Sequence, residues 1–110
     1  MIEETLVSMV DRFNSHVHRN PAVKQELREI RRTIELHLTD GDTFQIILKD
    51  SQLSLPVKAD GTKPDVKIIT DRETFNGLVK KEIGPMKALV TRKLVIEASL
   101  EDKILLRRLL

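Results

Sequence analysis

The sequence predicts one α+β domain over residues 1–110, with five strands and about five helices. Three observations lead to this fold class. Apolar residues recur every three to four positions near both ends of the chain. Between residues 34 and 57 they alternate with polar residues. Turn and helix-capping residues separate these segments, and a chain of 110 residues is long enough to bury one core.

The first 30 residues are expected to form two helices. Residues 2–18 carry one apolar stripe at helical spacing. Asn20 followed by Pro21 is typical of an N-cap and the first position of a second, short helix. The apolar positions of the two helices are Ile2, Leu6, Met9, Val10, Phe13, Val17, Val23, Leu27 and Ile30.

Residues 34–57 predict a three-stranded antiparallel meander with one apolar face. Asp40-Gly41 and Asp50-Ser51 are placed at its two turns. Pro56 cannot donate a ladder hydrogen bond, so the third strand is expected at a sheet edge. The alternating apolar residues are Ile34, Leu36, Leu38, Phe44, Ile46, Leu48, Leu53, Leu55 and Val57.

The second half is expected to contain two more strands and three helices. Residues 58–65 form a loop, residues 65–70 a fourth strand and residues 93–97 a fifth. Thr70 with Glu73 resembles a capping box that opens a helix. Gly84-Pro85 begins a short helix. Ser99 with Asp102 caps the last helix, residues 100–110.

Composition argues against several functions. The chain has no cysteine, tryptophan or tyrosine, which removes thiolate chemistry and weakens any nucleic-acid role, since single-stranded nucleic acid is usually stacked on aromatic rings. No apolar run is long enough to cross a membrane, so we expect a cytoplasmic protein. His16 and His18 are rotated by about 200° from one another around a helix, so they lie on opposite sides of it and cannot share a metal. No residue is nominated as catalytic, and no metal or cofactor is expected.

Charge is uneven along the chain. Residues 1–55 have a net charge of −2, from seven Lys/Arg and nine Asp/Glu, whereas residues 56–110 have +4, from twelve and eight. The basic half favours an anionic partner or a membrane surface, or is simply a solvated surface. Five cations gather around the expected helix turn in this half: Lys80, Lys81, Lys87, Arg92 and Lys93.

The order of elements and several motifs resemble the sterol carrier protein type 2 domain family. The stretches TIELHLTDG and TFQIILKDSQLSL, at residues 33–41 and 43–55, are similar to the family's opening hairpins. PDVKIITDRETFNGLV, at residues 64–79, is similar to its next strand and capped helix. Pro85 to Ala88 match its Pro-x-x-Ala turn, and residues 93–110 its last strand and helix. The likeness covers roughly residues 20–110.

The resemblance implies a five-stranded, mostly antiparallel sheet covered on one side by helices. It also implies non-catalytic binding, and transfer, of a fatty acid, fatty acyl-CoA, phospholipid or sterol-like molecule in an apolar tunnel between sheet and helices. The last helix would act as a lid, and the five cations would meet a headgroup or a membrane during transient contact. The residues expected to line the tunnel are Phe44, Ile46, Leu48, Ile68, Phe75, Leu78, Val79, Met86, Leu89, Val90, Ile104, Leu105 and Leu109.

Three residues depart from the family, which usually has glycine at positions 81, 92 and 98. Lys81, Arg92 and Ala98 stand there. Glycine after a helix often takes a positive φ, and lysine in that conformation costs about 1 kcal/mol unless the backbone rearranges. The alternative function is a protein-interaction or scaffold subunit with a fully packed core and no ligand, in which the last helix is a core element or a homodimer contact.

Overall fold

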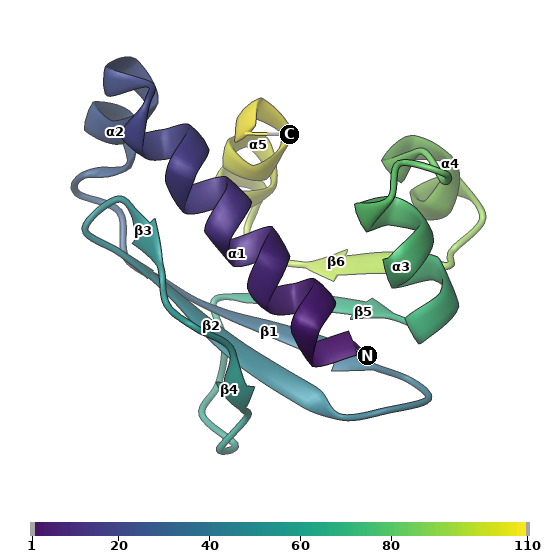
Figure 1. Ribbon diagram of the computed structural model, residues 1–110. Helices are drawn as coiled ribbons and strands as arrows, with labels where there is room; N and C mark the ends of the chain where they lie inside the picture. Colours follow the sequence, from purple (N-terminus) through teal and green to yellow (C-terminus); the bar gives the residue numbers. More distant parts are fainter. Residues whose placement is uncertain (1, 110) are drawn as a thin grey trace.

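The computed structural model describes the backbone of residues 2–109 and the side chains of residues 3–105. Five helices and six strands are found in this part of the chain (Figure 1). Their order is α1 (Ile2–His18), α2 (Pro21–Leu27), β1 (Arg32–Leu38), β2 (Thr43–Lys49), β3 (Gln52–Leu53), β4 (Val57–Lys58), β5 (Val66–Thr70), α3 (Arg72–Val79), α4 (Pro85–Val90), β6 (Leu94–Glu97) and α5 (Leu100–Leu109).

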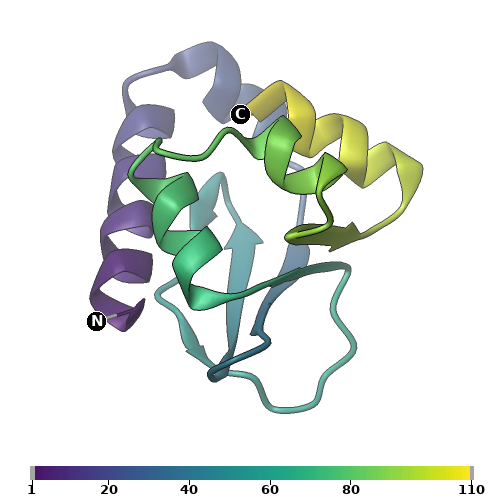
Figure 2. The same ribbon diagram turned by 90° about the vertical axis from the view of Figure 1, so that its right-hand side faces the viewer.

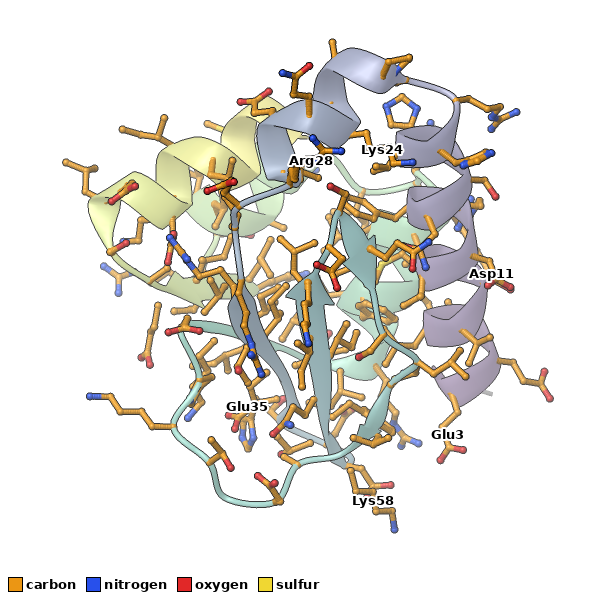
Figure 3. The ribbon with its side chains drawn as sticks, turned by 90° about the vertical axis from the view of Figure 1, so that its left-hand side faces the viewer. Glu3, Asp11, Lys24, Arg28, Glu35 and Lys58 are labelled. Atoms are coloured by element: carbon orange, nitrogen blue, oxygen red, sulfur yellow. The ribbon has the colours of Figure 1, made fainter. Side chains whose placement is uncertain are left out.

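The strands form one sheet in the order β3-β2-β1-β5-β6, with β4 also paired to β2. All pairs are antiparallel except β1 with β5. The helices lie on the same side of this sheet (Figures 1 and 2), and the opposite face of β1 and β2 has no helix over it (Figure 3). The predicted α+β class, with five strand positions and helices on one side, is therefore confirmed.

The amphipathic pattern of the N-terminal segment places α1 against the sheet. Leu6, Val10 and Val17 are buried, whereas Glu3 and Asp11 point from the other side of the helix into solvent (Figure 3). Separation of the two faces is what the helical period predicts. The predicted start of α2 is also confirmed, because the Asn20 side chain accepts a hydrogen bond from the Val23 amide and Pro21 is the first helical residue.

The third strand of the meander differs from the prediction. It consists of two short pieces, β3 and β4, and Leu55 and Val57 are 63% and 56% exposed. Leu53 pairs with Leu48, but Val57 pairs with Gln45, so the register shifts by one residue between the two pieces. A shift of one residue turns every following side chain to the other face of the sheet. Strict alternation from residue 53 to 57 was therefore wrong.

The interrupted strand lies at the edge of the sheet, as Pro56 predicts, and α1 covers part of that edge. The Asn14 side chain donates to the Leu53 carbonyl at 3.0 Å and accepts from the Leu53 amide at 2.8 Å. An amide side chain in this position satisfies the groups that a neighbouring strand would otherwise pair with. Next to it, Ser51 is buried in the turn and donates to the Lys24 carbonyl of α2 at 2.6 Å.

The N-cap of α3 lies one residue later in the sequence than predicted. Thr70 is the last residue of β5, and its hydroxyl donates to the Lys93 carbonyl. Asp71 is the N-cap and accepts from the Thr74 amide at 2.7 Å. Hydrogen bonds from Thr74 lower the pKa of the Asp71 carboxyl below its usual range. The predicted Thr70 cap is therefore wrong, because Thr70 is needed to join β5 to the start of β6.

The helices α3 and α4 both end in a Schellman motif with a cation at the left-handed position. Lys81 has φ 62° and Arg92 has φ 61°. Their amides bond to Leu78 and Leu89 carbonyls, and the amides of the next residues bond to Gly77 and Ala88 carbonyls. The backbone thus keeps the glycine-type conformation at both positions instead of rearranging. The third departure, Ala98, is not among the residues with positive φ.

Because Lys81 and Arg92 occupy a conformation that favours glycine, Lys81→Gly and Arg92→Gly should each raise the free energy of unfolding by about 0.5–1 kcal/mol. Lys80→Gly is the matched control. Lys80 is the C-cap residue of α3 and has φ −80°, so glycine at this position only raises the conformational entropy of the unfolded chain and lowers stability. Urea denaturation of the variants measures the effect. A loss of stability in Lys81→Gly equal to that in Lys80→Gly would contradict this account.

Candidate functional site

The helix-facing side of the sheet is apolar across β1, β2, β5 and β6. Leu36 of β1 pairs with Phe44 of β2 and with Ile68 of β5, and Ile68 pairs with Ile96 of β6. Paired residues point to the same face of a sheet. Leu36 and Phe44 pack with Leu6 and Val10 of α1 and Phe75 of α3 in one buried cluster. This row of side chains is therefore the floor beneath the helices.

The helices cover this floor unevenly. On β1 and β2, Leu36, Phe44 and Ile46 are 3–4% exposed. On β5 and β6, Ile68 and Ile96 are only partly buried, although both belong to the helix-facing side. Ile68 lies on an inner strand, where a closed helix layer would bury it completely. Apolar surface at Ile68 and Ile96 thus stays partly accessible, whereas Val66, Thr70 and Leu94 on the same side of these strands are buried.

A second buried cluster lies toward the other end of the sheet. Val17, Leu27 and Leu48 form its centre, and Leu105 of α5 packs against it. Leu53 is partly buried and contacts both clusters. The apolar interior is therefore divided into two groups, one beneath α1 and α3 and one near α2 and α5.

The predicted lining residues differ in how far they are exposed to solvent. Phe44, Ile46, Leu48 and Phe75 are buried, and Ile68, Leu78, Val79, Leu89 and Leu105 are partly buried. Met86, Val90 and Ile104 are 70%, 77% and 53% exposed. Leu109 belongs to α5, but its side chain lies outside the described side chains. The structure brings Phe44, Ile46, Ile68, Phe75 and Val79 together in one cluster.

The connection between α3 and α4 depends on close packing against Gly77. A Cβ atom at this position would collide with the Ile83 side chain. Without a side chain, Gly77 allows Ile83 to fold back over α3, and its carbonyl accepts hydrogen bonds from Glu82 and Ile83. This local contact fixes where α4 begins, and so where its apolar side chains lie.

The five predicted cations are all exposed. The ion pairs found among the described side chains join Arg32 to Asp102, Lys67 to Glu35 and Arg72 to Asp40, and so include none of the five. Lys81 and Arg92 follow α3 and α4 directly, at the left-handed positions described above. Within residues 3–105, positive charge around α4 is therefore left without an ion-pair partner.

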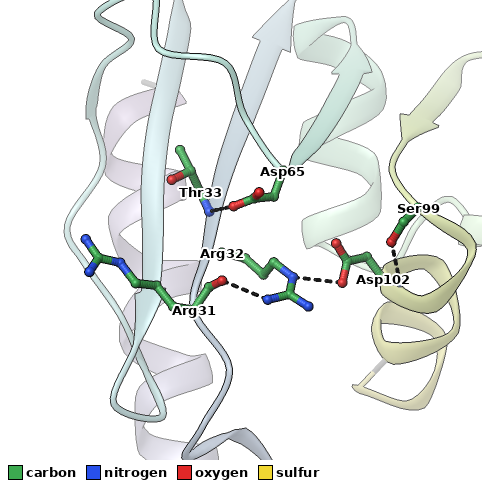
Figure 4. Close-up of polar contacts among 6 residues, drawn as sticks. All are labelled: Arg31, Arg32, Thr33, Asp65, Ser99 and Asp102. Carbon is green, nitrogen blue, oxygen red and sulfur yellow. Dashed lines mark hydrogen bonds and ion pairs between the residues drawn. The ribbon is translucent and has the colours of Figure 1, made fainter.

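The start of α5 is held to the sheet by a polar contact that the sequence did not predict. The Arg32 Nε atom donates to the Asp102 Oδ1 atom at 2.8 Å (Figure 4). The Arg32 side chain is 29% exposed and that of Asp102 is 8% exposed. This hydrogen bond raises the pKa of Arg32. Ser99 also caps the helix, as predicted, by accepting from the Asp102 amide at 3.1 Å.

Polar chemistry is scarce at this site. Among the described residues, no group of three or more His, Asp or Glu side chains is arranged to hold a metal ion. In the same part of the chain, every buried side-chain nitrogen and oxygen has a hydrogen-bond partner. None of the described helices is long and apolar enough to cross a membrane. What the site offers a ligand is chiefly apolar surface.

An α+β domain with an apolar sheet face under helices is the architecture of the sterol carrier proteins. A sequence profile of the SCP-2 sterol transfer family matches residues 11–108, and the chain belongs to this family. The resemblance seen in the sequence is thereby confirmed, and membership supports lipid binding or transfer as the general function. No curated protein sequence matches the chain.

Solved structures share the fold at low sequence identity. The crystal structure of Sterol Carrier Protein 2 Like 2 from Aedes aegypti is 15% identical, covers 94% of this chain and 96% of its own, and has a TM-score of 0.60. The solution structure of palmitated SCP2L2 from Aedes aegypti is 18% identical, with coverages of 94% and 88% and a TM-score of 0.60.

A similar domain also occurs within larger enzymes. A double mutant of the sec-alkylsulfatase PisA1 is 12% identical over 79% of this chain, with a TM-score of 0.64. The chain spans 14% of the length of that protein. This likeness shows the fold alone.

Because Arg32 neutralises a nearly buried carboxylate, Arg32→Gln should lower the free energy of unfolding by about 1–3 kcal/mol. It should also speed amide hydrogen exchange in α5, since the contact fixes the start of that helix. The neighbouring exposed Arg31 provides the control, and Arg31→Gln should change stability by less than about 0.5 kcal/mol. Equal effects of the two substitutions in urea denaturation and hydrogen exchange would show that the contact does not hold α5.

Proposed function

We propose that residues 1–110 are a single cytoplasmic lipid-binding domain that holds one long-chain lipid between the sheet and its helices, without catalysis. The ligand class is a fatty acid, fatty acyl-CoA, phospholipid or sterol-like molecule. The observation that carries the proposal is the partial exposure of Ile68 and Ile96 on the helix-facing side of the sheet. Family membership supports the same conclusion.

The proposed compartment has β5 and β6 as its floor. Its walls are drawn from the buried and partly buried members of the predicted lining. Phe75, Leu78 and Val79 come from α3, Leu89 from α4 and Leu105 from α5. Met86, Val90 and Ile104 are too exposed to form walls in this state, and we place them outside the compartment.

Apolar burial is the main source of affinity for such a ligand. Each CH₂ group moved from water into an apolar site contributes about 0.8 kcal/mol. A tail of about 14 carbons therefore gains on the order of 10 kcal/mol before the costs of ordering and association. Because this free energy does not depend on directional contacts, selectivity for the tail would follow its length more than its detailed chemistry.

The free-energy cost of a cavity limits how large an empty compartment can be. A rigid void of about 300 Å³ would cost roughly 7 kcal/mol at about 24 cal/mol per Å³. A small domain has only about 5–15 kcal/mol of stability in total. The ligand-free protein is therefore expected to draw its helices inward, and a ligand would push them apart.

The helix α5 is the element best suited to move. It is attached near its start, through the Ser99 cap and the Arg32–Asp102 contact, and Leu105 adds a contact with the second cluster. A helix held near one end can swing at the other without breaking the sheet. We assign α5 as the lid of the compartment.

The cations near α4 are proposed to meet the polar end of the ligand. Lys80, Lys81, Lys87, Arg92 and Lys93 are exposed close to the ends of α3 and α4. An anionic headgroup left at the mouth of the compartment would lie in their combined field. The palmitated form of the Aedes aegypti protein makes palmitate a suitable first probe for this chain.

The chain offers a paired test in two adjacent residues of β5. Ile68 faces the helices and Ile69 faces the opposite side, where it pairs with His37 and Val95. Ile68→Trp fills the proposed compartment and should weaken palmitate binding at least about tenfold, a loss of about 1.4 kcal/mol. Ile69→Trp should leave affinity within about twofold. Displacement of a fluorescent fatty acid from delipidated protein measures both.

Circular dichroism and urea denaturation confirm that both variants are folded. Equal palmitate affinities of the two variants would show that the ligand does not bind on the helix-facing side of the sheet. No fatty-acid uptake by the wild-type chain, together with a stable complex with another protein, would favour the scaffold function.

A further inference from the structure

The two short helices that flank β6 expose apolar side chains in a way that core packing does not explain. On α4, Met86 and Val90 are four residues apart, and each points about 160° from the buried Ala88. On α5, Leu100 and Ile104 repeat this spacing and point as far from the buried Asp102. Amphipathic helices of a water-soluble domain normally place polar residues on this side.

These four residues are 53–77% exposed, and we call them the α4–α5 ridge. Both views place α4 and α5 at a similar height above the sheet, at the two ends of β6 and far from β4 (Figures 1 and 2). A single flat surface can therefore contact both helices. The ridge consists of aliphatic side chains from two separate elements.

Charge around the ridge favours an anionic surface. Between residues 80 and 104 there are six exposed cations and three exposed carboxylates, the latter being Glu82, Glu97 and Glu101. Lys87 and Lys103 lie next to the apolar pairs along their helices. Long lysine side chains can reach the headgroup region while neighbouring apolar groups enter the acyl boundary. Each cation close to an anionic membrane adds to the attraction.

We propose that the α4–α5 ridge docks on an anionic lipid bilayer, with Met86, Val90, Leu100 and Ile104 entering the acyl boundary. The proposal rests on the proposed function for its purpose, because docking here would bring the lid helix α5 to the membrane that supplies or receives the lipid. The surface itself is defined by exposure and charge alone.

Vesicle co-sedimentation tests the docking directly. The probes are vesicles of phosphatidylcholine alone and of phosphatidylcholine with about a third phosphatidylserine. The wild-type chain should bind the anionic vesicles, and binding should fall as salt rises. The variant Met86→Gln, Val90→Thr, Leu100→Gln, Ile104→Gln should bind them at least about tenfold more weakly, since each side chain loses apolar area. Lys87→Gln with Lys103→Gln should reduce the preference for anionic over neutral vesicles.

The matched control lies near the opposite end of the molecule. Leu55 and Val57, on either side of Pro56, are 63% and 56% exposed, so Leu55→Gln with Val57→Thr repeats the two changes Leu100→Gln and Val90→Thr at exposed positions outside the ridge. This control should bind vesicles as the wild type does. All substituted side chains are exposed, and urea denaturation verifies folding.

Fatty-acid displacement in solution separates this inference from the proposed function. A ridge variant that loses vesicle binding but keeps fatty-acid affinity supports the inference. A wild-type chain that takes up fatty acid but binds no vesicles overturns the inference and leaves the proposed function standing. Equal vesicle binding by the ridge variant and the control also overturns it. Light scattering gives a further contrary outcome. If the wild type is a dimer that binds no vesicles, and the ridge variant is a monomer, the ridge contacts a second copy of the chain and the inference is overturned.

Discussion

The structure depends on one apolar sheet face that its helices cover to different extents. Over β1, β2 and β3, the long helix α1 supplies enough side chains to bury Leu36, Phe44 and Ile46. Over β5 and β6 the cover comes from short helices, and Ile68 and Ile96 stay partly exposed. The first region supplies a stable core. The second supplies apolar surface that a guest molecule can complete.

This division explains why fold and function can share one small core. If the same helices had to close both regions, an apolar ligand would compete with the packing that keeps the chain folded. Here the α1 contacts of the first cluster and the Asn14 bonds to Leu53 do not involve α5, whose Leu105 packs against the second cluster beside Val17. The lid can therefore respond to a ligand while the α1 layer stays in place.

Most of the fold could be predicted because its signals are local. Helical periodicity, the Asn20-Pro21 start and the Asp40-Gly41 turn each lie within a few residues. The register shift between Leu53 and Val57 could not be predicted, since it is defined by pairing with β2. The Arg32–Asp102 contact joins residues 70 positions apart and has no local signal. Met86 and Val90 point outward because the Ala88 side of α4 packs against the protein. In the sequence, the small residue Ala88 was only a weak indication of this.

The direct test is whether a ligand enters on the helix-facing side of β5 and β6. Isoleucine methyl resonances can be followed by NMR as palmitate is added to delipidated protein. Ile68 and Ile96 should shift or broaden strongly, and Ile47 and Ile69, whose register puts them on the opposite face, should change little. Equal changes on both faces, or none on Ile68 and Ile96 at saturating palmitate, would contradict a compartment between sheet and helices.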